Sequence, residues 1–145
     1  MADRTHKALN EFVAEAQETI DALGRELLRL ARAGADEPDP DVLNAVFRGA
    51  HSLKGLSSMF GVERMARLAH ALEDVLDDVR MGRRPLDPAA LDLLLEAPEL
   101  FSRILAEEAS GAAPRTAEAA ARLAERLRAH AAPAAAAAEP AEGPA

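Results

Sequence analysis

The segment Ala50–Gly55, Ala-His-Ser-Leu-Lys-Gly, places a histidine, a lysine and a glycine on neighbouring turns of a predicted helix. Lysine is rare in this chain, because only Lys7 and Lys54 are lysines among 17 Lys and Arg residues. A lysine three residues after His51 indicates a need for a compact, flexible ammonium rather than a planar guanidinium. A phosphoryl group on the imidazole would create that need, since it brings negative charge and strong acceptor oxygens.

A histidine that accepts phosphate needs one exposed ring nitrogen as nucleophile and a partner on the other nitrogen that fixes the tautomer. A carboxylate does this well and stabilises the positive charge that develops as the ring attacks. Glu73 is the candidate, because it lies one turn after His70 on a helix expected to run antiparallel to that of His51. Gly55 removes a side chain where a donor or acceptor of the phosphoryl group would approach.

Apolar residues at three- and four-residue steps predict the helices that position these side chains. The four long ones cover residues 5–33, 40–59, 62–81 and 88–110. Asp39-Pro40 and Asp87-Pro88 each supply an N-cap followed by a first-turn proline. Pro98 is expected to kink the fourth helix or to restart it. The buried stripe expected for the second helix consists of Leu43, Val46, Phe47, Ala50 and Leu53.

A shorter fifth helix is predicted over residues 115–130, with Leu123 and Leu127 as its main apolar anchors. Residues 132–145 are rich in proline and alanine, cannot bury a core and are expected to form a disordered linker. The predicted fold is therefore all-α: an antiparallel up-down four-helix bundle with an additional C-terminal fifth helix. Residues 1–131 form the expected domain and residues 132–145 the linker.

The composition excludes several kinds of function. A net charge of -8 and a pI near 5.0 argue against nucleic acid or an anionic membrane as partner, because both require a basic face. The absence of cysteine excludes disulfides and thiolate chemistry and is compatible with the cytoplasm, the expected location. No apolar run approaches the roughly 20 residues of a membrane span, and there is no signal-peptide pattern.

The run His51-Ser52-Leu53-Lys54-Gly55, followed nineteen residues later by His70 and then by Glu73, resembles the histidine phosphotransfer (Hpt) domains. The nearest likeness is to the N-terminal phosphotransfer domain of the CheA-type chemotaxis histidine kinases. Residues 47–55 and 59–61 both resemble the sequence pattern of that subfamily. The resemblance spans about residues 10–130. Leu56 departs from it, since many relatives have a small residue there, and so does Pro98.

The resemblance implies that a separate kinase domain, which binds ATP and Mg²⁺, phosphorylates His51. His51 then passes the phosphoryl group to an aspartate of a response regulator. Glu73 would hydrogen-bond the His51 ring, while Lys54 and His70 would complete the polar cluster. The chain would thus be part of a histidine protein kinase, bind no cofactor itself and be tethered by its Pro/Ala-rich segment.

Other interpretations remain open from the residues alone. The chain could be a free-standing Hpt shuttle, or a metal-binding bundle with His51, His70 and Glu73 as ligands, although the repeated Glu-x-x-His motifs of di-iron bundles are missing. A structural adaptor would explain the helices but not the histidine-lysine-glycine face. No Gly-rich phosphate loop is present, so the segment is not expected to phosphorylate itself. His70 could also simply pair with Asp74 or Asp77 at helical spacing.

Overall fold

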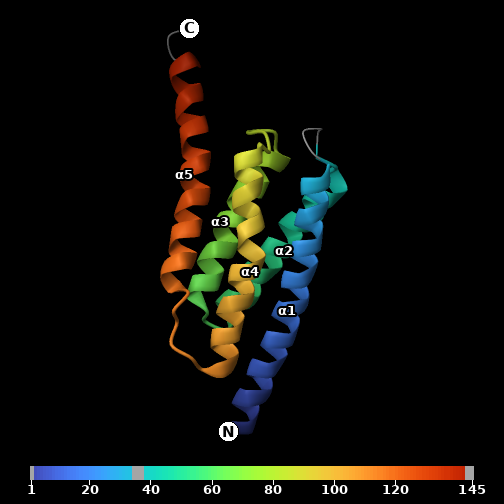
Figure 1. The fold of residues 1–145 in the computed structure, drawn as a ribbon, viewed down its shortest axis with the longest axis vertical. Helices are drawn as coiled ribbons and strands as arrows, with labels where there is room; N and C mark the ends of the chain where they lie inside the picture. Colours follow the sequence, from blue (N-terminus) through green and yellow to red (C-terminus); the bar gives the residue numbers. More distant parts are fainter. Residues whose placement is uncertain (1, 34–37, 143–145) are drawn as a thin grey trace.

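The chain folds into helices only, over the residues that the structure describes. A computed structural model describes residues 2–33 and 38–142, and the side chains of residues 6–33 and 38–130. The five helices are α1 Ala2–Arg32, α2 Pro40–Met59, α3 Glu63–Arg80, α4 Pro88–Ser110 and α5 Ala117–Glu142. Figure 1 shows α1 to α4 alternating in direction along the long axis, with α5 beside α3 and α4. The predicted up-down four-helix bundle with a fifth helix is confirmed.

Local capping explains why the helices begin and end where they do. The Asp39 carboxylate accepts a hydrogen bond from the Asp41 amide at 2.9 Å, directly before Pro40. Asp87 accepts one from the amide of Ala90 at 2.8 Å at the start of α4. Such caps satisfy amides that have no partner within a helix. The α4 helix ends at Gly111, whose φ of 69° is a left-handed conformation that favours glycine.

The core is the apolar side that α1 to α4 share. In sequence order, α1 packs against α2 and α4, α2 packs most extensively against α3, and α5 covers α3 and α4. Buried alanines alternate with larger residues, which lets the helices approach closely. The largest fully buried side chains are Phe12, Phe101, Ile20, Leu23, Leu27, Leu53, Met65, Leu68, Leu72, Leu76, Leu94 and Ile104. The tight α2–α3 pairing fixes the relative position of the two helices that carry the predicted site.

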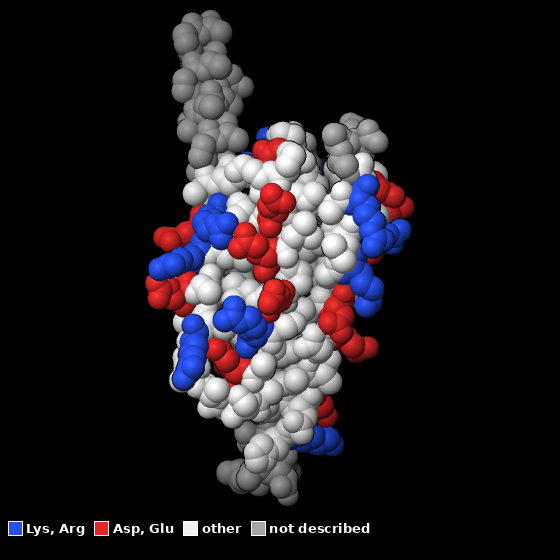
Figure 2. Space-filling model, in the orientation of Figure 1, with Lys and Arg blue, Asp and Glu red and all other residues white. Residues whose placement is uncertain are grey.

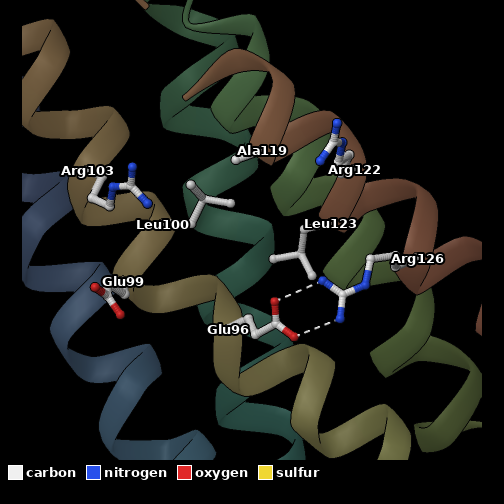
Figure 3. A pocket seen from close by; sticks show the side chains of 8 residues that line it. All are labelled: Glu96, Glu99, Leu100, Arg103, Ala119, Arg122, Leu123 and Arg126. Carbon is white, nitrogen blue, oxygen red and sulfur yellow. Dashed lines mark hydrogen bonds and ion pairs between the residues drawn. The ribbon is translucent and has the colours of Figure 1, made fainter. Parts of the chain in front are cut away.

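Polar contacts attach α5 to the bundle. The Glu107 carboxylate of α4 accepts hydrogen bonds from the hydroxyl and the amide of Thr116, just before α5, and from Arg64 of α3 at 3.3 Å. Farther along α5, both Nη atoms of Arg126 donate to Glu96 of α4 at 3.0 Å (Figure 3). These pairs hold α5 against the side of the bundle formed by α3 and α4.

The α5 helix is longer than predicted, because it continues to Glu142 instead of ending at residue 130. Alanine has the highest helix propensity of all residues, and this segment is rich in it. At His130, the last residue of α5 whose side chain is described, the backbone carbonyl accepts a hydrogen bond from Arg84 at 2.8 Å. The side chains of the predicted linker, residues 132–145, lie outside the described ones, as do residues 143–145 entirely. The domain boundary at residue 131 stays a prediction.

Pro98 lies inside α4, which is one continuous helix. Of the two outcomes expected at Pro98, a restart of the helix is therefore wrong, and a kink stays a prediction. A Cβ added to Gly24 of α1 would lie 3.7 Å from Pro98 Cβ, so the two helices pass close to each other here. Pro98 cannot donate a backbone hydrogen bond, and the helix nevertheless continues through it to Ser110.

The surface charge is mixed on the face seen in Figure 2, where acidic side chains run down the middle and both acidic and basic side chains lie along the two sides. This face has no continuous basic stripe of the kind that nucleic acid requires, in agreement with the net charge of -8. Among the described helices, none is long and apolar enough to cross a bilayer.

Candidate functional site

His51 and Glu73 meet at the interface between α2 and α3. Nδ1 of His51 is hydrogen-bonded to Oε2 of Glu73. The His51 side chain is 64% exposed, whereas that of Glu73 is 12% exposed. A carboxylate can only accept, so Nδ1 carries the proton and the lone pair of the neutral ring lies on Nε2. Among the described residues, Nε2 has no hydrogen-bond partner, and the arrangement therefore presents a nucleophilic nitrogen toward solvent.

Lys54 binds the other oxygen of the same carboxylate. Its Nζ donates to Oε1 of Glu73 at 2.5 Å from one turn after His51. Burial alone would raise the pKa of Glu73, but the hydrogen bonds from Lys54 and His51 outweigh it and hold this pKa below its ordinary value. Glu73 is thus ionised at neutral pH, and its charge stabilises an imidazolium at position 51.

His70 lies beside this cluster rather than within its hydrogen bonds. Its Nε2 is 3.5 Å from Oδ1 of Asp74, one turn later on α3, and its side chain is 52% exposed. A ring nitrogen of His70 lies within 4.8 Å of a Glu73 oxygen, but the Glu73 carboxylate is hydrogen-bonded to His51 and Lys54 and, among the described residues, not to His70. The helical-spacing pair with Asp74 is therefore formed, and the role of His70 in the chemistry stays a prediction.

Gly55 is exposed on the same helix as His51. A Cβ added there would have no other atom within 4 Å, so the helix surface is open at this point. The neighbouring Ser57 is buried, and its hydroxyl donates to the Leu53 carbonyl at 2.5 Å. The hydroxyl of Ser57 therefore has its hydrogen-bond partner within α2 and does not point to the site. Gly55 is the residue that leaves room next to His51.

Phe47 belongs to the site although its spacing predicted a core position. It is half-buried and, with Asp74 and Asp77, completes the lining of the shallow pocket that contains His51, Lys54 and Glu73. Its ring is nearly parallel to that of His51, with an angle of 12° and centroids 6.4 Å apart. The only signal in the sequence is its place one turn before His51, which the buried-stripe interpretation did not use.

The donor groups that could hold a metal ion differ from those predicted for the metal-binding alternative. Ligand atoms of His70, Glu73 and Asp74 lie within 4.8 Å of one another, and His51 is not among them. Both oxygens of Glu73 already bind Lys54 and His51. A cation on Glu73 would have to displace the Lys54 ammonium, so the geometry favours a hydrogen-bonded nucleophile over a metal centre.

A separate groove runs between α4 and α5, and Figure 3 shows Leu100 and Leu123 at its floor. Its rim is formed by charged side chains, among them Arg103 and the Glu96–Arg126 pair. None of the residues predicted to do chemistry lines it. The candidate site is therefore the α2–α3 surface around His51.

Comparison with known proteins agrees with this geometry. The model of the Hpt domain family matches residues 7–107, and the chain belongs to this family. Its relatives include the chemotaxis protein CheA of Cereibacter sphaeroides, 36% identical over 100 residues, and that of Bacillus subtilis, 37% identical over 89 residues. These alignments cover 69% and 61% of this chain but only 15% and 13% of the relatives. The matched segment of the chain thus spans about one seventh of their length.

The solved structures include a similar domain in complex with another protein. The phosphorylated P1 domain of CheA3, in complex with CheY6 from R. sphaeroides, superposes with a TM-score of 0.76 at 27% identity. The match covers 89% of this chain and 98% of that one. Among Hpt domains, this chain is therefore similar to the P1 domains of CheA proteins, and the resemblance inferred from the motif is confirmed.

Proposed function

We propose that His51 is the phosphoacceptor of a CheA-like histidine kinase. The observation that carries this proposal is the hydrogen bond between Glu73 and Nδ1 of His51, which leaves Nε2 free on an exposed ring. Family membership supports it, as does the phosphorylated state of the similar P1 domain.

The reaction at His51 is a transfer of the γ-phosphoryl group of ATP. Nε2 forms a bond to phosphorus while the bond from phosphorus to the bridging oxygen breaks, and ADP leaves. The ring becomes a cation with its proton still on Nδ1, where the ionised Glu73 stabilises it. Lys54, one turn away and partly exposed, is close enough to offer its ammonium to the new phosphoryl oxygens.

ATP and Mg²⁺ would be bound by a separate kinase domain of the same protein or of its dimer partner. This segment has no nucleotide-binding motif, so it acts as the substrate of that domain and contributes no cofactor site of its own. A histidine protein kinase of this design is a phosphotransferase of the cytoplasm, where ATP is available.

The second partner would be the receiver domain of a response regulator. There the Nε2–phosphorus bond breaks as an aspartate oxygen forms the new bond. The similar P1 domain was solved with CheY6, and the open helix surface at Gly55 gives a receiver access to His51. The likeness to the P1 domains of CheA proteins supports a domain tethered to a kinase rather than a free-standing shuttle.

The experiment is a two-step transfer with purified parts. The chain is incubated with the kinase domain of the C. sphaeroides CheA relative and γ-³²P-ATP, and a receiver domain is then added. The expected label on the chain is stable in alkali, labile in acid, absent from His51→Gln, and lost to the receiver within minutes. Equal labelling of His51→Gln would contradict the assignment of the phosphoacceptor.

A further inference from the structure

Phe47 is placed to control the orientation of the His51 ring. It lies on the preceding turn of α2, and the side chain of a helical residue leans back over that turn. The two rings are inclined by only 12°, with centroids 6.4 Å apart, which is within the range of offset-parallel aromatic pairs. The half-buried Phe47 ring therefore flanks the imidazole on the side toward which His51 leans.

Arg80, at the end of α3, fixes Phe47 in turn. The central carbon of its guanidinium is 4.1 Å from the centroid of the Phe47 ring, a cation–π contact. The guanidinium is itself held by Asp77, which accepts a hydrogen bond from Arg80 at 2.8 Å and another from Arg83 at 3.0 Å. The aromatic ring next to His51 is thus held across the α2–α3 interface.

His51 needs such a second constraint, because its ring is largely in solvent and is not confined by core packing. The terminal torsion of an imidazole is broad, and the bond to Glu73 fixes only the Nδ1 edge. Without a neighbour on the Phe47 side, the ring could turn away from Glu73 and move Nε2 out of line with an incoming phosphorus atom. Small misplacements of a reacting atom lower the rate of the chemical step strongly.

We propose that Phe47, held by Arg80, is a positioning residue for phosphorylation of His51. It keeps Nδ1 on Glu73 and aims Nε2 outward, and it touches neither the phosphoryl donor nor the phosphorus atom. This inference rests on the proposed role of His51 as phosphoacceptor and adds a residue to that site.

The test uses phosphoramidate, a small donor that requires no protein partner. Nε2 of His51 forms a bond to phosphorus, the nitrogen–phosphorus bond of phosphoramidate breaks, and the leaving nitrogen takes up a proton and departs as ammonia. We expect Phe47→Leu to lower the rate at saturating phosphoramidate about three- to tenfold. The matched control is Phe60→Leu, the same change just after the far end of α2, where the Phe60 ring packs against Phe12 at a tilt of 32°; its rate should equal that of the wild type.

Arg80 provides a second variant that leaves the core intact, because it lies on the surface. Arg80→Gln should slow phosphorylation in the same direction, and Arg80→Lys, which retains a cation over the ring, should restore most of the rate. Nitrogen NMR of the His51 ring reports the tautomer directly: it should be Nδ1–H in the wild type and a mixture in Phe47→Leu and Arg80→Gln. Urea unfolding of both variants is the control, because a general loss of α2–α3 packing would also release the ring from Glu73, whereas a positioning role predicts the change of tautomer at wild-type stability.

Wild-type rates and an unchanged tautomer in both Phe47→Leu and Arg80→Gln would overturn the positioning role while leaving His51 as the phosphoacceptor. Failure of the proposed function has another signature, in which phosphoramidate labels His51 but the kinase domain with ATP does not. The two ideas can therefore fail separately.

Discussion

Nδ1 of His51 on α2 and Oε2 of Glu73 on α3 are hydrogen-bonded although 22 positions separate them in the chain. The bond joins an exposed ring to a buried carboxylate across the most extensive helix interface of the bundle. Because the α2–α3 packing holds Glu73 beside His51, this bond fixes the tautomer of the imidazole and the direction in which Nε2 points.

Removing the charge of Glu73 should slow phosphorylation of His51. Glu73→Gln keeps the size of the side chain but cannot stabilise the imidazolium, so we expect the rate to fall by at least about tenfold. Glu63→Gln, on the exposed first turn of the same helix, is the control and should retain the wild-type rate. Both variants should keep the helical circular dichroism of the wild type. Equal rates for Glu73→Gln and the wild type would remove Glu73 from the mechanism.

The depressed pKa of Glu73 predicts how stability depends on pH. Burial by itself raises the pKa of Glu73. The hydrogen bonds from Lys54 and His51 lower it by more than burial raises it, so the net pKa is below the ordinary 4.5. The folded state therefore binds the proton less readily than the unfolded state. The resulting stabilisation is complete above about pH 5 and is lost as the pH falls through the folded pKa.

This dependence can be measured by urea unfolding of the wild type and of Glu73→Gln between pH 7 and pH 3. The difference in unfolding free energy between the two proteins should shrink as the pH decreases, because the glutamine variant lacks this group. A difference that stays constant over the whole interval would mean that Glu73 does not titrate differently in the two states.

Gly55→Ala should separate stability from function. A Cβ at this position meets no other atom within 4 Å, so the alanine should stabilise the exposed helix by about 0.5–1 kcal/mol. If Gly55 is where the protein partners approach, the same variant should slow transfer to a receiver but not phosphorylation by phosphoramidate. Urea unfolding and the two rates check this, and unchanged transfer to the receiver would contradict the approach role.

His70→Ala should have a smaller effect than Glu73→Gln. The ion pair of His70 is with Asp74, and no hydrogen bond links it to His51 among the described residues. We expect less than about a threefold change in the phosphorylation rate, in keeping with an exposed helical pair. A loss as large as that of Glu73→Gln would place His70 in the catalytic network through a contact made only in the reaction.

The sequence predicts the fold and the central pair well. The Asp-Pro caps and the apolar stripe place α2 at Pro40–Met59, the same bounds that the structure shows. The His51–Glu73 pair can be predicted once α2 and α3 are expected to be antiparallel, because the length of the connection between the two helices then determines which residues lie opposite each other. A phosphate-accepting imidazole needs one free ring nitrogen and one that is hydrogen-bonded to a partner. This requirement favours a carboxylate as the partner of His51.

Other features depend on contacts that spacing does not encode. Phe47 lies at the edge of the apolar stripe, where it packs partly against the core and also flanks His51 under the guanidinium of Arg80; spacing alone predicts only the first of these contacts. His70 could be assigned to the cluster or to Asp74, since both lie within reach on one helix. The continuity of α4 through Pro98 could not be predicted either, because a proline within a helical pattern is compatible with a kink as well as with a restart of the helix.

The most direct test of the central claim is to identify the atom that carries the phosphate. The chain, labelled with ¹⁵N in its histidines, is phosphorylated by the kinase domain and ATP and examined by NMR for a coupling between ³¹P and a ring nitrogen. We predict one coupled nitrogen, Nε2 of His51, with Nδ1 still protonated. Phosphate on Nδ1 of His51, or on His70 or another residue, would contradict the account.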